Sequence, residues 1–196
     1  YFTTSDPNDV QIRALADSIY RRTDFRWLQV RPPTLALGWS PENGHLPYDW
    51  RGYNEAMLLH ILALGSPTHP AAGDVWNKAW TTGYKFGTFG GQSYLGFAPL
   101  FGHQYSHIWV DFRGIRDAPM RAAHSDYFTN SVRATYAQRM YALANPLGFR
   151  GYGARLWGLT ACDGPLDSTF ELDGRDREFH TYEARGASMD RVTDDG

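Results

Sequence analysis

Residues 50–70 read WRGYNEAMLLHILALGSPTHP. A nearly continuous apolar run follows Glu55, and Gly65 and Pro67 stand after it, as is typical of the C-terminus of a helix. This pattern predicts a helix over about 53–64 that is apolar enough to be buried on both sides. Glu55 would then lie in the first turn of an inner helix.

Three further helices are predicted around this one. Asp6 and Pro7 suit the N-cap and first position of a helix that runs to about Phe25. This helix would bury a stripe that includes Ile12, Leu15, Ile19 and Trp27. The other two helices are expected at about 74–84 and 125–144. The predicted fold class is therefore all-α.

Three long segments separate these helices, at residues 31–52, 85–124 and 146–165. They are rich in glycine, proline and aromatic residues. Loops longer than about 12–15 residues are usually functional or disordered, and these hold too many aromatic rings to be disordered. We expect them to form the walls of a site.

The composition excludes several function classes. The chain has 196 residues and a net charge of −2, and no run of basic residues is present, which argues against a nucleic-acid partner. The longest apolar run is too short to span a bilayer. A single cysteine, Cys162, excludes an internal disulfide framework and a cysteine-based zinc site.

Aromatic residues make up 15% of the chain, including seven tryptophans and twelve tyrosines. These side chains combine an apolar face with a polar group. Such a lining suits ligands made of rings edged with hydroxyl groups, sugars above all. The alternative is that the aromatic rings simply fill a core.

Two interpretations of Glu55 remain open from the sequence. A carboxylate at the start of a helix can simply stabilise the positive end of the helix dipole. Alternatively, burial beside Trp50 and Tyr53 would favour the protonated form of the carboxyl group near neutral pH. A glycosidase needs such a general acid, because the leaving oxygen must gain a proton as the bond breaks.

A second block, residues 103–111, reads HQYSHIWVD. Its two histidines are four residues apart, as in zinc-binding His-Glu-X-X-His helices, but Gln104 stands where the glutamate would be. If the segment is extended, alternate side chains project to one side. Those side chains are His103, Tyr105, His107, Trp109 and Asp111. We expect this strip to contact sugar hydroxyl groups rather than a metal ion.

Beyond residue 165 the composition changes. Segment 166–196 lacks tryptophan and is dominated by charged residues, so we expect it to be mobile. Just before it, Asp163 is followed by Gly164 and Pro165. This order is ordinary turn chemistry, although an acidic side chain there could also contact a substrate.

Four blocks of the sequence resemble the bacterial glucoamylase-like family, which includes endo-β-1,2-glucanases and a related domain of cyclic β-1,2-glucan synthases. They are WSPENG at 39–44, GYNEAM at 52–57 with LGSPTHP at 64–70, PLFGHQYSH at 99–107 and WGLTACDGP at 157–165. The resemblance covers about residues 5–165.

The resemblance implies an (α/α)6 toroid, of which four helices would be an incomplete part. Residues 1–165 would be the central part of the catalytic domain, and 166–196 its charged continuation. The family's catalytic glutamate falls on Glu55, and its acidic partner is expected upstream of Tyr1. No cofactor or metal ion is implied.

The resemblance also suggests which residues bind substrate. Glu42, His103 and His107 match family positions, and we assign them to substrate contact. Around them, Trp39, Trp50, Tyr105 and Trp109 are expected to stack on glucose rings. Asp111 and Asp163 are expected to hydrogen-bond hydroxyl groups.

The function expected on this basis is endo-hydrolysis of β-1,2-glucan with Glu55 as the proton donor. A transglycosylating domain of a cyclic glucan synthase and a non-catalytic glucan-binding module are the alternatives. A periplasmic or secreted location follows from the family's polymeric substrate alone.

Overall fold

The structure is a computed structural model that describes residues 2–146, 148–183, 186–187 and 192–193. The chain divides into two compact units, each described here by itself. The first comprises Tyr1–Gly52 and Ala56–Gly83, and the second comprises Tyr53–Glu55 and Tyr84–Gly196.

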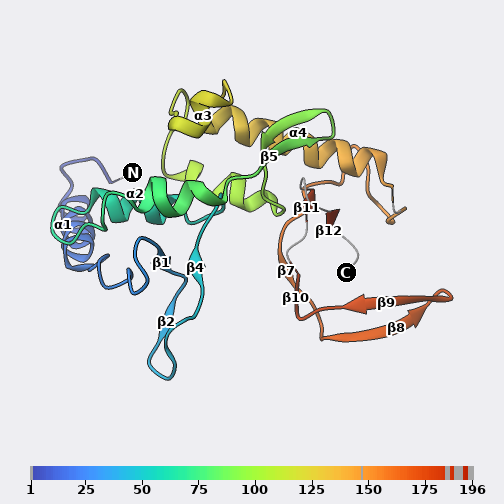
Figure 1. The fold of residues 1–196 in the computed structure, drawn as a ribbon, viewed down its shortest axis with the longest axis horizontal. Helices are drawn as coiled ribbons and strands as arrows, with labels where there is room; N and C mark the ends of the chain where they lie inside the picture. Colours follow the sequence, from blue (N-terminus) through green and yellow to red (C-terminus); the bar gives the residue numbers. More distant parts are fainter. Residues whose placement is uncertain (1, 147, 184–185, 188–191, 194–196) are drawn as a thin grey trace. The chain divides into compact units, whose positions relative to one another are not determined.

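The first unit combines helices with two small antiparallel sheets, β1–β4 and β2–β3 (Figure 1). Its elements are α1 (Pro7–Arg22), β1 (Leu35–Ala36), β2 (Trp39–Ser40), β3 (Gly44–His45), β4 (Asp49–Trp50), α2 (Met57–Gly65), η1 (Trp76–Trp80) and η2 (Thr81–Gly83).

The second unit contains the longest helix and further hairpins. Its elements are β5 (Phe86–Phe89), β6 (Gln92–Leu95), η3 (Leu100–His103), η4 (Tyr105–Ile108), α3 (Ala118–Ala122), α4 (Tyr127–Ala144), β7 (Cys162–Asp163), β8 (Ser168–Leu172), β9 (Arg175–Phe179), β10 (Tyr182–Glu183), β11 (Gly186–Ala187) and β12 (Val192–Thr193). The prediction of an all-α chain is therefore wrong, because hairpins occupy much of the sequence between the helices.

Helix α1 begins as predicted. The Asp6 carboxylate accepts a hydrogen bond of 2.8 Å from the Asn8 amide, and Pro7 takes the first helical position. The predicted burial of its apolar stripe is wrong, since no residue of α1 is buried. Leu15 and Ile19 are 56% and 58% exposed.

Helix α2 begins later than predicted, at Met57, so Glu55 lies ahead of the helix rather than in its first turn. Its buried residues are Met57, His60 and Ala63, which share one face at a spacing of three. Leu62 is 40% exposed, so the expectation of burial on both sides is also wrong. The predicted helix at 74–84 forms as a π turn, η1, followed by a 3-10 turn, η2.

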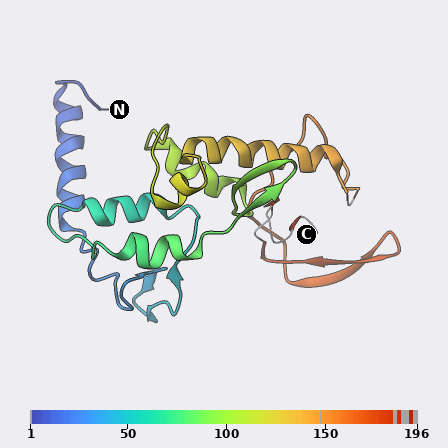
Figure 2. The same cartoon turned by 45° about the horizontal axis from the view of Figure 1, so that its top comes forward.

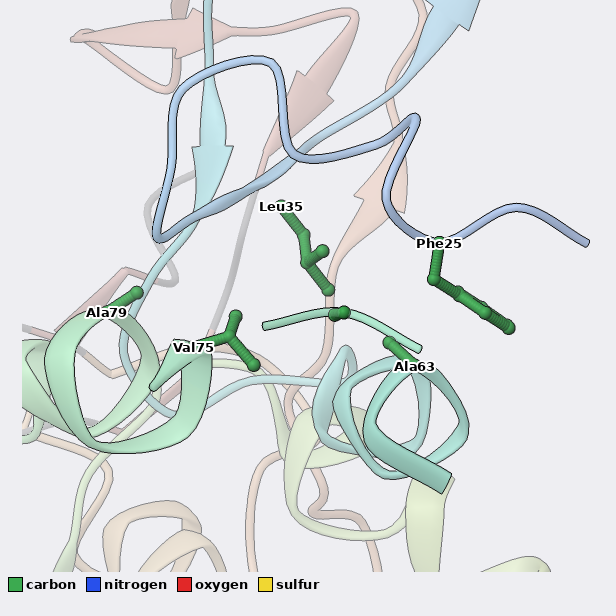
Figure 3. Packing of buried hydrophobic residues seen from close by; sticks show 6 residues of the cluster. Phe25, Leu35, Ala63, Val75 and Ala79 are labelled. Atoms are coloured by element: carbon green, nitrogen blue, oxygen red, sulfur yellow. The ribbon is translucent and has the colours of Figure 1, made fainter. Parts of the chain in front are cut away.

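The core of the first unit gathers small and aliphatic side chains from several elements. Leu35, Ala63, Val75 and Ala79 pack together with Phe25 (Figure 3). Figure 2 shows the ribbons of α2 and η1 lying beside each other. Alanine at these positions lets the backbones approach closely. The side chain of Trp50 packs on this cluster from β4.

The hairpin β5–β6 turns at Gly90 and Gly91, whose φ angles of +54° and +74° favour glycine. It packs on α4 through Tyr94, Ala134 and Ala137. Asn130 of α4 strengthens this contact. Its Oδ1 accepts from the Leu95 amide at 2.7 Å, and its Nδ2 donates to the Leu95 carbonyl at 3.1 Å.

Gln138, about two turns further along α4, joins two distant segments in the same manner. Its Nε2 donates to the Ala98 carbonyl at 2.9 Å, and its Oε1 accepts from the Leu159 amide at 3.1 Å. Helix α4 therefore contacts the family-like segment 157–165 and the residue directly before the family-like segment 99–107.

Within 166–196, strands β8 and β9 pair over five residues each around a turn at Asp173 and Gly174. The sequence analysis did not foresee this hairpin. That this segment is mobile stays a prediction.

Candidate active site

The turn that precedes α2 places Glu55. Tyr53 and Asn54 are buried, and Glu55 is half-buried. The Ser106 hydroxyl of η4 donates to the Glu55 backbone carbonyl at 3.3 Å. Glu55 Oε2 is shielded from solvent and has no hydrogen-bond partner among the residues that the structure describes. Buried carboxylate oxygens are normally paired, so this atom makes Glu55 the candidate catalytic residue of the site.

Residues 100–108 form two 3-10 turns, η3 and η4, neither a continuous α-helix nor a strand. Gly102 is required in η3, because a Cβ there would lie 2.2 Å from the Phe97 ring. The expectation of an extended strip is wrong. Within that block, His103 is buried, whereas Tyr105 and Trp109 are 48% and 62% exposed.

His103 points into the second unit. Its Nε2 lies 3.0 Å from the Phe97 carbonyl oxygen, and since a carbonyl can only accept, Nε2 carries the proton. Nδ1 then has a free lone pair and no partner among the described residues. Burial lowers the pKa of His103 to about 4, so the ring is neutral at physiological pH. The rings of Tyr53 and Tyr94 pack against it, with centroids 5.1 and 5.8 Å away.

His107 is half-buried against Phe112, with ring centroids 4.7 Å apart. Burial lowers the pKa of His107, and the nearby Asp111 carboxylate offsets part of this effect. Asp111 itself is exposed. It accepts a hydrogen bond of 3.1 Å from the Arg113 amide and forms an ion pair with the Arg113 guanidinium group at 3.3 Å.

A shallow pocket of about 360 Å³ brings together three of the predicted substrate residues, His107, Trp109 and Asp111. Its wall combines aromatic rings with polar groups, an arrangement suited to a sugar. The other lining residues are Gln104, Ile108, Val110, Phe112, Arg113, Phe128 and Ser131.

The sequence analysis missed a chain of hydroxyl groups in the second unit. Tyr127 donates to the Asp117 carboxylate at 2.6 Å, and Tyr84 donates in turn to the Tyr127 oxygen at 2.6 Å. The ring of Tyr53 stacks on that of Tyr127, with centroids 6.0 Å apart. Since these tyrosines are scattered along the chain, no local pattern could have found them.

A second pocket of about 530 Å³, which the sequence analysis also missed, lies where β5 and β6 meet α3 and α4. Its wall includes Phe86, Tyr94, Ser125 and Arg133. None of the predicted site residues lines it.

Three predicted substrate residues belong to the first unit. Trp39 and Glu42 are exposed on the β2–β3 hairpin. Trp50 is half-buried, since it packs on the core. Its contact with substrate stays a prediction.

Asp163 is exposed in the second unit, on strand β7, and pairs with Tyr182 of β10. A two-stranded ladder therefore includes this residue, and it lies outside the lining of both pockets.

Among the described residues, no group of three or more histidine, cysteine, aspartate or glutamate side chains is arranged to hold a metal ion. Within that same part of the chain, no helix is both long and apolar enough to cross a membrane.

The comparison with protein families identifies the class to which this fold and site belong. A family described as "Putative glucoamylase" matches residues 47–196, which is more than half of the chain. The chain belongs to this glucoamylase-like family.

Similar proteins come from Parabacteroides and Bacteroides species. An exo-β-1,2-glucooligosaccharide sophorohydrolase of Parabacteroides distasonis is 24% identical over 190 residues, which cover 83% of this chain and 26% of that protein. A crystal structure from Bacteroides caccae, with the same description as the family, is 27% identical with a TM-score of 0.75 and covers 95% of this chain and 43% of that one.

A β-1,2-glucanase structure from Parabacteroides distasonis has a TM-score of 0.74 at 23% identity, over 95% of this chain and 28% of that one. This likeness concerns the fold alone. The chain thus spans less than half the length of each of these relatives.

Proposed function

We propose that this chain is part of a glycoside hydrolase that cleaves β-1,2-linked glucan, with Glu55 as the proton donor. The observation that carries this proposal is the shielded and unpaired Oε2 atom of Glu55. The family membership and the activity named for the Parabacteroides distasonis relative support the substrate class.

The proposed chemistry needs a carboxylic acid beside the scissile bond. In its protonated form, Glu55 would donate a proton to the glycosidic oxygen as the bond to the anomeric carbon breaks. Oε2 accepts no hydrogen bond from the described residues, so its hydrogen-bonding capacity is left for another group, for which we propose a substrate oxygen or an intervening water molecule.

The substrate would be held by the aromatic and polar residues already described. In the second unit these are His107, Trp109 and Asp111, which share one pocket. A neutral His107 can both donate to and accept from sugar hydroxyl groups. Its lowered pKa therefore suits recognition of an uncharged ligand.

The cleavage mode and the wider architecture are parts of the same proposal. We expect endo-hydrolysis, whereas the named relative is exo-acting. The likeness to larger solved structures supports the view that this chain contributes to an (α/α)6 toroid. A periplasmic or secreted location fits a polymeric substrate.

The test compares Glu55→Gln with the unchanged protein, using the full-length polypeptide that carries this chain and linear β-1,2-glucan as substrate. Loss of a general acid is expected to lower kcat by about 10²–10⁴-fold. Glu171→Gln on the exposed strand β8 is the matched control and should retain the full rate. Near-normal activity of Glu55→Gln would overturn the mechanism.

Product analysis of the same reaction resolves the cleavage mode. A range of oligosaccharide lengths from the start of the reaction indicates endo-hydrolysis, whereas disaccharide alone indicates exo-hydrolysis. Cyclic or lengthened products would instead favour a transglycosylase.

A further inference from the structure

Two tryptophans of the first unit form an exposed aromatic surface. Trp27 lies in the turn after α1, where its amide donates to the Asp24 carboxylate, and Trp39 lies on β2. Their ring centroids are 5.6 Å apart in an edge-to-face arrangement. The ring of His45, which faces Trp39 across the β2–β3 pair, lies 4.2 Å from that of Trp27. We call Trp27, Trp39 and His45 the Trp27 surface.

The exposure of these rings distinguishes them from core tryptophans. Trp27 and Trp39 are 48% and 49% exposed, whereas Trp80 of the same unit is completely buried. The sequence pattern predicted that Trp27 would be buried in the stripe of the first helix. The structure instead places it beyond the end of α1, beside another exposed indole. Adjacent exposed aromatic rings are typical of binding surfaces.

Contacts between the rings restrict their motion. Trp27 touches both Trp39 and His45, so each ring limits the rotation of its neighbour. A surface that is ordered before it binds loses less conformational entropy on binding. The restricted rotation of these rings therefore favours binding of a ligand that packs on the flat ring faces.

The charges around the Trp27 surface favour an uncharged ligand with hydroxyl groups. Arg31, on the same unit, is held by the Asp49 carboxylate at 2.6 Å and by the Leu46 and Tyr48 carbonyls. Its guanidinium group is therefore already engaged. At the tip of the β2–β3 hairpin, Glu42 is exposed, and a carboxylate accepts hydrogen bonds from hydroxyl groups but repels anions.

Hydrogen-bonding groups border the aromatic surface. The indole N–H group of a tryptophan is a donor in such a site, and the exposed Glu42 carboxylate on the same hairpin is an acceptor. Apolar ring faces bordered by a few hydrogen-bonding groups match the CH faces and hydroxyl edges of glucose.

We propose that Trp27 and Trp39 form a stacking surface for glucose rings of a β-linked glucan. This inference rests on the proposed function for the class of ligand, but it assigns binding to Trp27, which none of the sequence motifs included. The Trp27 surface contributes affinity for the glucan and takes no part in the bond-breaking step.

The experiment measures binding and turnover separately in the full-length polypeptide. Isothermal titration with linear β-1,2-glucan gives Kd, and hydrolysis of the same glucan gives KM and kcat. The variant Trp27→Ala is expected to raise Kd and KM about fivefold to tenfold and to leave kcat within about twofold. Trp27→Phe keeps a ring and should recover part of the affinity. Tyr136→Ala, which removes a 54% exposed ring from α4, is the matched control and should bind as the unchanged protein does.

The outcomes separate this inference from the proposed function. If the unchanged protein cleaves β-1,2-glucan and Trp27→Ala has the same Kd and KM, the stacking surface is refuted and the proposed function stands. Such a result would leave protein docking as the role of the exposed rings. If the unchanged protein binds the glucan in a Trp27-dependent manner without cleaving it, the proposed hydrolysis is refuted and the stacking surface stands.

Discussion

The Ser106 hydroxyl donates to the backbone carbonyl of Glu55, and this bond of 3.3 Å joins the turn before α2 to the 3-10 turn η4. Ser106 is completely buried. The bond therefore fixes the backbone of the proposed proton donor from a segment that lies 51 residues further along the chain.

Removing this bond should disturb the position of the proton donor. Ser106→Ala is expected to lower kcat about threefold to tenfold with little change in KM, because a hydrogen bond of this type contributes about 0.5–1.5 kcal/mol. Steady-state kinetics on β-1,2-glucan check the effect. Ser93→Ala, which removes an exposed hydroxyl group bonded to Thr88, is the control and should not change kcat. An unchanged kcat in Ser106→Ala would contradict the positioning role.

Acid should destabilise the protein through its buried histidines. The pKa of His103 falls from 6.5 in the unfolded chain to about 4 on burial, so the unfolded state binds more protons between these values. The contribution of His103 to the free energy of unfolding is therefore fully present above about pH 6.5. The free energy of unfolding declines by about 2–4 kcal/mol as the pH falls to about 4. Burial lowers the pKa values of His60 and His107 as well, in the same direction.

Urea unfolding at about pH 7.5 and about pH 4.5 checks this expectation. The variant His103→Gln cannot bind the proton, so its stability should depend less on pH. Equal pH dependence of the variant and the unchanged protein would show that His103 is not the group responsible.

The chain of hydrogen bonds from Tyr84 through Tyr127 to Asp117 should stabilise the fold of the second unit. Tyr127→Phe removes the hydroxyl group that bridges Tyr84 and Asp117. Leaving these two groups without their shared partner is expected to lower the free energy of unfolding by about 1–3 kcal/mol. Thermal or urea unfolding measures the change. Tyr136→Phe, an exposed position, should change the stability by less than about 0.5 kcal/mol, and a similar loss in both variants would refute the role of the bridge.

Two glycines of the first unit touch closely enough to forbid a side chain. A Cβ on Gly83 would lie 2.8 Å from the backbone nitrogen and Cα of Gly52. Gly83→Ala should therefore destabilise the protein by more than about 2 kcal/mol, because backbone atoms must move apart. In Gly73→Ala the new methyl group meets no atom within 4 Å, so this control should fold with nearly unchanged stability in the same urea experiment.

The sequence predicted best where a local rule decides the structure. Asp6 and Pro7 begin α1 as expected. Helix α4 ends before Pro146 as expected, with Asn145 as a left-handed cap whose amide donates to the Tyr141 carbonyl. The hairpins were missed, although Gly90-Gly91 and Asp173-Gly174 are ordinary signals for tight turns. Helical spacing, on which the prediction rested, does not detect strands of four or five residues.

The candidate site was predictable only in part. The three residues of the smaller pocket, His107, Trp109 and Asp111, come from one short segment, so the sequence could group them. The burial of His103 depends on Tyr53 and Tyr94, which come from two other segments. Spacing within the histidine block could not reveal it.

The paired hydrogen bonds between Asn130 and Leu95 have a consequence for the behaviour of the protein at high concentration. Asn130 presents an amide to β6 in the way that a neighbouring peptide group would, and thereby occupies both backbone groups of Leu95. The unpaired backbone N–H and C=O groups of an open strand edge can pair with another polypeptide and extend the sheet. At Leu95 both backbone groups are already bonded to one helical side chain, so this position of β6 is closed to pairing with another polypeptide.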